Sequence, residues 1–509
     1  MTTALRRVTA FCPACHRDGE ARPLVDVHRL AGELEVDAQG HVWLVRTCPE
    51  HGRIETLYQE DATILAYLEE WQAPPMKVSP DDPTNLAPVP SCYFRGLGGR
   101  QTQHTCILLE DVTLSCDLRC PTCFADASPG DGTFVPMREV LASVDRRLAR
   151  EGGRLDVVMV SGGEPTTHPE IVPLLDELAR RPIVRILLNT NGLRLGHDDE
   201  LLTFLHRRND RIELYLQFDG FREETWRHHR GADLRARKAE VVRRLSVAGV
   251  FTTLVMCTSL GVNDDEIGDV VRFAFETPYV GGVCVQPQFA SGRSGPIDPR
   301  ERLTHTGVLA RLGPQTDGLV TWRDMIGLPC SHPHCASVGY FLLADDGRWR
   351  SLVSILGPDE LKARLDLVQD RIAWQPSRTV RRLLRDSLMG LLSERNALSH
   401  PATTRMLLNL GLHADLRART MAGLLADVTP RGRRRARTWV ATHVKRLTVK
   451  PFMDIDTMIE ERLLRCCVHV GTEGEAGAQA APFCAVQAWP ELNRTRPATR
   501  ASHQPVGAS

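Results

Sequence analysis

Fifteen cysteines are the residues of this 509-residue chain whose spacing predicts chemistry. Three of them form a C-x3-C-x2-C loop, Cys116-Asp-Leu-Arg-Cys120-Pro-Thr-Cys123, directly after a predicted strand. Three thiolates this close together can bind three irons of a [4Fe–4S] cube and leave the fourth iron open. An open iron can bind a substrate, as an open catalytic metal site does. The spacing alone fits equally a zinc site with a remote fourth ligand, or buried structural cysteines.

Polar motifs at the ends of the next three predicted strands favour the catalytic alternative. They are Ser161-Gly162-Gly163-Glu164-Pro165, Asn189-Thr190-Asn191-Gly192 and Gln217-Phe218-Asp219-Gly220. Two glycines permit close approach of the backbone to a ligand, and a carboxylate can accept from an ammonium. Polar residues at the carboxyl ends of barrel strands are where such folds place their chemistry, although they can also merely tie down loops. The predicted cofactor contacts are Gly162, Gly163, Glu164, Asn189, Asn191, Gln217 and Asp219.

A second group of metal ligands lies near the N-terminus. Cys12-Pro-Ala-Cys15 and Cys48-Pro-Glu-His51 are two tight knuckles that together supply four ligands. This pattern is typical of a tetrahedral zinc or mononuclear iron site, and unmetallated cysteines are the alternative. Because the protein fills all four positions, we expect the site to be closed and structural.

A third group lies far along the chain. Cys330-Ser-His-Pro-His-Cys335 is followed by Cys466-Cys467 and by Cys484. Four thiolates from Cys330, Cys335, one of Cys466 and Cys467, and Cys484 would complete an auxiliary cluster without an open iron. The alternatives are core cysteines, or a zinc ion bound by His332 or His334.

Short apolar runs alternate with amphipathic stretches from about residue 104 to 290. Six β/α units in this span predict a parallel sheet curved into a partial or complete barrel. The predicted strands are Ile107–Thr113, Leu155–Val160, Val184–Leu188, Ile212–Phe218, Thr252–Cys257 and Gly282–Gln286. The predicted helices include Met137–Arg150, Glu170–Arg180, Ala239–Ala248 and Asp265–Phe275.

The rest of the chain divides around this barrel. We predict a Cys/His metal-binding domain over residues 1–72, with strands at Glu33–Val36 and His41–Val45, and a Pro-rich linker over 73–103. The barrel occupies 104–295, a mainly helical region with the auxiliary cluster occupies 296–486, and the tail over 487–509 is disordered. Within this scheme, residues 290–345 read as irregular and 357–450 as mostly helical, and Thr429–Lys450 is locally basic.

Composition narrows the class of protein further. Lys and Arg (63) balance Asp and Glu (63), so the whole chain shows no electrostatic footprint for nucleic acid. No run is apolar for the ~18 residues that a membrane span needs, and the start lacks the apolar core of a secretory signal. Clustered cysteines in a reducing compartment indicate metal or catalysis. We therefore expect a cytoplasmic protein, with peripheral association at a membrane surface also allowed.

The Cys loop and the barrel motifs, from Cys106 to about Arg293, resemble the radical S-adenosylmethionine (SAM) superfamily. The resemblance implies that Cys116, Cys120 and Cys123 bind a [4Fe–4S] cluster whose open iron takes the amino and carboxylate groups of SAM. It also implies that Gly162, Gly163 and Glu164 contact the cofactor. The implied fold is an α/β partial (β/α)6 barrel with an N-terminal rubredoxin-like Cys/His unit.

The outlying motifs resemble one subgroup, the archaeal tetraether-lipid synthases and the radical pterin methylases. The Cys/His unit, "LQFDG", "GVND", "QPQFASGR", "PCSHPHC" and "RCCVH…PFC" carry this resemblance. Relatives have a four-Cys run just upstream of the barrel, where this chain keeps only Cys92 and Cys106. The departure puts a second auxiliary cluster in doubt.

The implied activity is reductive cleavage of SAM to a 5′-deoxyadenosyl radical, followed by C–C bond formation on a lipid or pterin-like substrate. The expected partners are that substrate and an electron donor such as ferredoxin or flavodoxin. A different class, a non-catalytic metal-bearing protein that binds RNA or anionic lipid through its basic C-terminal helix, is the alternative. An intact loop for an open iron speaks against it.

Overall fold

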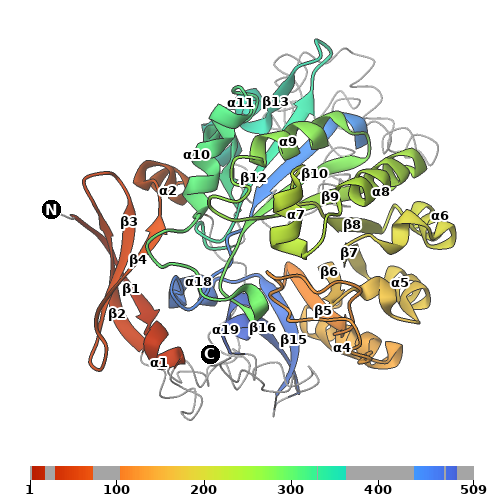
Figure 1. The fold of residues 1–509 in the computed structure, drawn as a ribbon, viewed down its shortest axis with the longest axis horizontal. Coiled ribbons are helices and arrows are strands. Elements are labelled where there is room, and N and C mark those ends of the chain that lie inside the picture. The colour runs from red at the N-terminus through yellow and green to blue at the C-terminus, as the bar shows by residue number, and fades with distance from the viewer. Residues whose placement is uncertain are drawn as a thin grey trace, which may run out of the picture.

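The computed structural model describes residues 3–17, 29–72, 104–328, 331–362, 441–474 and 477–489 (Figure 1). The predicted linker over 73–103 lies outside the described residues, and so do most of the predicted tail and residues 363–440 of the predicted helical region. The described chain forms a four-stranded sheet near the N-terminus and a large curved sheet of twelve strands.

The N-terminal sheet is antiparallel, and its strands follow one another in chain order. Its alternating apolar residues, such as Leu34 and Leu44, pack on Leu65 of the helix that follows the sheet. The predicted strand segments fall in β2 and β3. The elements are β1 (Thr3–Phe11), α1 (Pro13–Arg17), β2 (Arg29–Val36), β3 (Val42–Cys48), β4 (Gly52–Gln59) and α2 (Ala62–Glu69).

Six parallel strands form the centre of the large sheet, in the order in which they occur along the chain. They confirm the predicted partial barrel, and each lies at a predicted strand. The strands are β5 (Ile107–Thr113), β6 (Leu155–Gly162), β7 (Ile183–Thr190), β8 (Ile212–Gln217), β9 (Thr252–Thr258) and β10 (Val280–Pro287). The helices between them are α4 (Met137–Arg150), α5 (Ile171–Arg180), α6 (Asp199–Arg207), α7 (Glu223–Arg230), α8 (Arg235–Ala248) and α9 (Ile267–Glu276).

Successive residues of each barrel strand pack against different neighbours, because side chains alternate between the two faces of a sheet. On β5, Leu108 packs in the cluster that contains the crossover helices. Ile107 and Leu109 instead pack with Met453 and Phe483 of the C-terminal segment. Figure 1 shows the crossover helices along the outer side of the curved sheet, and the blue C-terminal strands belong to the sheet itself.

The described part of the C-terminal half contributes strands to both edges of the barrel, which the sequence analysis did not predict there. β14 (Val444–Val449) pairs in parallel with β10, and β15 (Val468–Gly474) pairs in parallel with β5. The predicted irregular stretch also holds regular elements. These are α10 (His305–Gln315), β11 (Ile326–Gly327) and β12 (Ser337–Leu343), after which come β13 (Trp349–Ser351), α11 (Leu352–Leu356), α12 (Pro358–Lys362), α18 (Glu460–Leu464), β16 (Gly477–Pro482) and α19 (Phe483–Ala488).

The described end of the basic stretch is a buried strand. Lys445 and Arg446 are 1% and 8% exposed in β14. The Lys445 ammonium donates to the carbonyls of Thr277 and Val280 at 2.8 and 2.6 Å, and Arg446 donates to Glu213 at 3.2 Å. Three of the six residues of this strand are β-branched (Val444, Thr448 and Val449), which fits a sheet better than a helix. These cations are therefore not on a solvated helix face, and the Arg431–Arg437 part of the stretch lies outside the described residues.

Buried ion pairs and hydrogen bonds join the N-terminal sheet to the C-terminal segment. Arg46, 2% exposed, donates to the carbonyl of Phe11 at 2.8 Å and to that of Asp456 at 3.0 Å. Two residues earlier in that segment, Asp454 accepts from Arg302 at 2.5 Å and from the amide of Ala290 at 3.1 Å. The segment is thus tied both to the N-terminal sheet and to the loop that follows β10.

The buried carboxyl group of Glu110 should make the free energy of unfolding depend on pH. Burial raises the pKa of Glu110 on β5 to about 7, although it accepts from Ser143 at 3.0 Å. Because the folded state prefers the protonated form, stability falls as pH rises from about 4.5 through about 7. We expect Glu110→Gln to stabilise the protein by about 3 kcal/mol at pH 8 and to change little near pH 4.

Denaturant unfolding of wild type and Glu110→Gln at both pH values measures this difference. Glu139→Gln, on the exposed side of α4, is the matched control and should show no such pH dependence. A stability difference between wild type and Glu110→Gln that is the same at both pH values contradicts the prediction.

Candidate functional site

The three-Cys loop begins where β5 ends. Cys120 is buried, and Cys116 and Cys123 are half-buried. The amide of Cys123 donates to the carbonyl of Cys120 at 3.3 Å, and the amide of Leu118 donates to the Cys116 sulfur at 3.4 Å. Burial raises the pKa of Cys116 to about 12, so its proton leaves when a metal binds rather than before.

An arginine that follows β10 holds the backbone of this loop. Arg293 donates from its side chain to the carbonyls of Cys120 at 3.1 Å and Ala127 at 2.5 Å, and to Asp126 at 2.8 Å. Its own amide donates to the carbonyl of Cys123 at 3.0 Å. Five hydrogen-bond donors on one side chain allow Arg to bridge several acceptors in this way. The loop conformation therefore depends on a residue about 170 positions away.

The two glycines at the end of β6 have a packing role within the protein. A Cβ on Gly162 would lie 2.2 Å from the carbonyl oxygen of Thr113, and one on Gly163 would lie 2.2 Å from that of Ser115. The Gly163 amide donates to Thr113 at 2.7 Å. The glycines therefore let the end of β6 approach the start of the Cys loop, and the packing that requires them is protein against protein.

Glu164 is buried and receives its hydrogen bonds from the protein. Its carboxylate accepts from the amide and hydroxyl of Thr166 at 3.1 and 2.6 Å, from the Thr190 hydroxyl at 2.7 Å and from the Asn191 amide at 2.7 Å. Burial raises the pKa of this carboxyl. Three of these bonds go to one oxygen, so the other, Oε2, keeps a lone pair for one further donor. Glu164 fastens the end of β7 to the end of β6.

Asn191 and Asn189 connect the end of β7 to different neighbours. The Asn191 amide group donates to Asp117 of the Cys loop at 2.5 Å. The Asn189 amide group donates to Ser161 at 3.1 Å and accepts from Gln217 at 3.1 Å. A continuous row of polar groups therefore crosses the carboxyl ends of β6, β7 and β8 beside the Cys loop.

Two cations that the sequence did not single out complete this row. Arg230, at the end of α7, donates to Gln217 at 2.9 Å and to both oxygens of Asp219 at 2.6 and 2.8 Å. The ammonium of Lys238 donates to the carbonyl of Gln217 at 2.8 Å and to that of Asn191. Burial lowers the pKa of Lys238 to about 8. One signal for Lys238 was present, since the chain has only five lysines.

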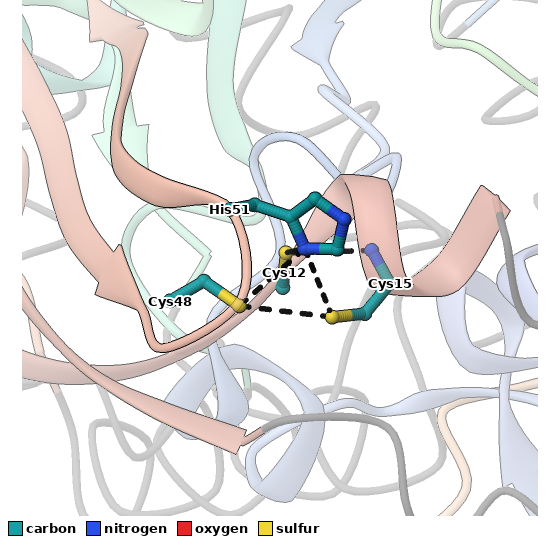
Figure 2. A group of neighbouring side chains, drawn as sticks. All are labelled: Cys12, Cys15, Cys48 and His51. Carbon is teal, nitrogen blue, oxygen red and sulfur yellow. Dashed lines mark hydrogen bonds between the residues drawn. The ribbon is translucent and has the colours of Figure 1, made fainter.

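The N-terminal group gathers as predicted (Figure 2). His51 Nδ1 lies 3.6, 3.3 and 3.6 Å from the sulfurs of Cys12, Cys15 and Cys48. The sulfurs of Cys15 and Cys48 are 3.7 Å apart. Helix α1 carries the first knuckle and the β3–β4 turn carries the second. Three thiols and one imidazole fit the tetrahedral coordination shell of a single metal ion.

Loss of this ion should destabilise the protein, because binding energy at a structural site is also folding energy. We expect Cys48→Ser to lose the ion and about 3 kcal/mol or more of stability. Cys284→Ser is the matched control, since both residues are 1% exposed and Cys284 lies outside every ligand group. Metal analysis and denaturant unfolding measure the effect. Equal metal content in the two variants contradicts the prediction.

The Cys116 loop differs from this compact site. Within the part of the chain that the structure describes, only the N-terminal group brings three or more Cys, His, Asp or Glu ligand atoms within 4.8 Å of one another. The three loop thiols are therefore spread more widely than ligands of one ion. This spread fits a cluster, which takes one thiolate per iron.

The third group is brought together in part. Burial, and to a smaller extent the charge of neighbouring thiols that include Cys335, raises the pKa of Cys466 and that of Cys484. Arg462, 3% exposed, donates to the Cys335 sulfur at 3.3 Å. Cys467 instead packs in an apolar cluster with Trp71. Cys466 and Cys467 both stay predicted ligands, and Cys330 and Cys92 lie outside the described residues.

The histidines beside Cys335 have protein partners. His334 uses both ring nitrogens, one with the Tyr58 hydroxyl at 2.9 Å and one with Glu69 at 2.8 Å. His332 Nδ1 accepts from the His334 amide at 3.2 Å. A zinc ion on His334 would have to displace one of these bonds.

Comparison with known proteins agrees with this geometry. Residues 111–274 match the model of the radical SAM superfamily, and residues 4–60 match the HMPTM N-terminal zinc ribbon domain. The 7,8-dihydro-6-hydroxymethylpterin dimethyltransferase of Methanocaldococcus jannaschii is 25% identical over 94% of this chain and 92% of its own length. The GTP 3′,8-cyclase of Moorella thermoacetica is 27% identical over 48% of this chain and 82% of its own length.

Solved structures align over shorter parts of the chain. A radical SAM methyltransferase from Sphaerobacter thermophilus aligns with a TM-score of 0.31 at 15% identity, over 62% of this chain and 74% of its own. SuiB of Streptococcus suis bound to SAM aligns with a TM-score of 0.31 at 17% identity, over 36% of this chain and 40% of its own.

These matches confirm the expected cofactors, a [4Fe–4S] cluster and SAM, together with a metal site at the N-terminus. Among the described residues, no helix is both long and apolar enough to cross a lipid bilayer. The expected auxiliary cluster stays a prediction. Residues 111–274 are a radical SAM domain behind an N-terminal zinc ribbon, and the chain is a radical SAM enzyme.

Proposed function

We propose that this enzyme transfers a methyl group to a carbon atom of a reduced, pterin-like small molecule. The observation that carries the proposal is similarity to the pterin dimethyltransferase over 94% of this chain and 92% of that protein. The similarity spans the zinc ribbon, the barrel and the C-terminal segment together, so it goes beyond the radical SAM domain alone. A lipid substrate, which the motifs also allow, is an outcome of the test below.

In this proposal Cys116, Cys120 and Cys123 hold the cluster. When bound, the cluster supplies the electron that cleaves SAM to a 5′-deoxyadenosyl radical. The polar row through Asn189 and Gln217 lies beside the loop and offers amide groups to the polar atoms of SAM. Gly162, Gly163 and Glu164 act mainly by fixing the ends of β6 and β7 against the loop, and Oε2 of Glu164 remains available to one ammonium hydrogen.

The remaining metal sites serve structure and electron supply. Cys12, Cys15, Cys48 and His51 hold one zinc or iron ion. Cys335, Cys466 and Cys484 are three ligands of an auxiliary [4Fe–4S] cluster, for which Cys330 is the fourth from its spacing. A small redox protein such as ferredoxin or flavodoxin would deliver electrons. Arg462 beside Cys335 would stabilise the negative charge of that cluster.

The test separates substrate classes under anaerobic conditions. The enzyme, reconstituted with iron and sulfide, receives dithionite, SAM, a reduced folate that carries a methylene group as the one-carbon donor, and either a dihydropterin or a lipid extract. We expect 5′-deoxyadenosine in both reactions and a mass gain of a methyl group only with the dihydropterin. Mass gain in the lipid fraction alone overturns the pterin proposal and leaves the radical SAM activity intact.

A further inference from the structure

Lys450 is a buried cation at the carboxyl end of the large sheet. It directly follows β14, and its amide donates to the carbonyl of Val285 on β10 at 2.9 Å, so it continues the parallel pairing of these two strands by one residue. The residue is 7% exposed, and its ammonium forms no hydrogen bond or ion pair within the described part of the chain. A buried ammonium without an acceptor costs free energy, so the stability of the fold does not explain this lysine.

Two other buried lysines show how a structural lysine is satisfied in this protein. The ammonium of Lys445, earlier in the same strand, donates to two backbone carbonyls at 2.8 and 2.6 Å. That of Lys238 also donates to two backbone carbonyls, at the ends of β7 and β8. Lys450 differs from both, because no acceptor of the described chain meets its charge.

The alternation of side chains along β14 shows which face of the sheet carries Lys450. Leu447 and Val449 pack in the cluster that contains the crossover helices. Thr448 is level with Cys284 of β10, which packs instead with the C-terminal segment. Because successive side chains point to opposite faces, Lys450 follows Thr448 onto the face away from the crossover helices.

A second polar group lies beside Lys450 at this strand end. Val285 is level with Val449, so the next residue of β10, Gln286, is level with Lys450. The amide nitrogen of Gln286 donates to the Cys284 sulfur at 3.7 Å, which leaves its amide oxygen as an acceptor. A cation and an amide acceptor on neighbouring strands, about 4.8 Å apart, can bind a carbonyl oxygen and an adjacent N–H of one ring.

Four phenylalanine rings connect this strand end to the Cys loop. Phe452, two residues after Lys450, packs on Phe289 with ring centroids 5.4 Å apart and on Phe483 at 4.6 Å. Phe289 packs in turn on Phe124, directly after the Cys loop, at 6.1 Å. Planar rings stack well on aromatic side chains. The lysine therefore lies beside an aromatic cluster that reaches the loop where the radical is formed.

We propose that Lys450 is a substrate-binding residue whose ammonium donates to the ring carbonyl oxygen of the pterin-like substrate, while the amide oxygen of Gln286 accepts from the adjacent ring N–H. The inference rests on the proposed function and names the groups that select its substrate. The pyrimidinone ring of a pterin presents a carbonyl oxygen beside an N–H, which these two groups complement. A hydrocarbon chain offers neither, and it would leave the ammonium unpaired, so Lys450 favours the pterin.

Anaerobic binding of the dihydropterin to the reconstituted enzyme in the presence of SAM tests this inference. For Lys450→Met we expect the Kd to rise about tenfold or more, because the variant loses a hydrogen bond from a charged donor. The Kd for SAM should stay within about twofold of wild type. Lys362→Met removes a lysine that is 30% exposed and paired with Glu70. It is the control for the change in net charge, and it should bind the dihydropterin as wild type does.

Denaturant unfolding separates substrate binding from a structural role. Because methionine removes a buried charge without an acceptor, Lys450→Met should unfold at the same or a higher denaturant concentration than wild type. Weaker dihydropterin binding with stability retained supports the inference. Unchanged affinity, lower stability, or weaker binding of SAM in place of the dihydropterin overturns it, and the proposed function then stands. Wild-type enzyme that does not bind the dihydropterin shows the proposed function to be wrong, and the role of Lys450 fails with it.

Discussion

Replacement of Cys116, Cys120 or Cys123 by alanine is expected to abolish formation of 5′-deoxyadenosine. Each substitution removes one of three thiols, and a cube held by the remaining two has no fixed open iron. We expect the loss to be complete rather than partial. Chromatography of anaerobic reactions with dithionite and SAM measures the product.

Cys257→Ala is the sharpest control for this experiment. Cys257 lies at the end of β9, close enough for its thiol to interact with Cys120 and Arg230. Its spacing in the sequence is not that of a ligand, so the variant should keep the iron of the cluster and the product. Loss of product in Cys257→Ala, with retention in Cys116→Ala, would contradict the assignment of the ligands.

The second large effect concerns stability. Asp454→Ala is expected to cost about 3–5 kcal/mol in free energy of unfolding, because it leaves Arg302 as an unpaired buried charge. The side chains of Arg302 and Asp454 are 5% and 0% exposed. The substitution also removes the acceptor for the amide of Ala290, at the start of the segment that carries Arg293. Denaturant unfolding measures the loss.

Two further variants test the cause of that loss. Asp454→Leu combined with Arg302→Met replaces the pair by apolar groups and should restore most of the stability. Glu240→Ala breaks the pair of Glu240 with Arg243, whose side chains are 45% and 64% exposed, and should cost less than about 1 kcal/mol. A loss from Asp454→Ala as small as that from Glu240→Ala shows that the pair contributes nothing to folding.

The site depends on these long-range ties. The N-terminal metal site is linked through Arg46 to the segment that carries Asp454, and Asp454 is linked to the loop that carries Arg293. Arg293 then holds the Cys loop. A zinc ribbon that is distant in the sequence thus takes part in supporting the loop that binds the cluster.

The sequence by itself determined the features that depend on near neighbours. Each of these features is local in the sequence: the Cys116, Cys120 and Cys123 loop, each knuckle of the N-terminal site, and each of the six barrel strands. Turn chemistry and alternation of apolar residues act over such distances, so they can be recognised without a structure.

Only the tertiary structure decided which partners these residues meet. It showed that Gly162 and Gly163 admit the Cys loop and that Glu164 is held by four protein donors. It also placed β14 in the sheet and Arg230 against Asp219. Each of these facts joins segments separated by many residues, and the free energy of such contacts depends on burial and on the approach of distant backbone, which local sequence patterns do not encode.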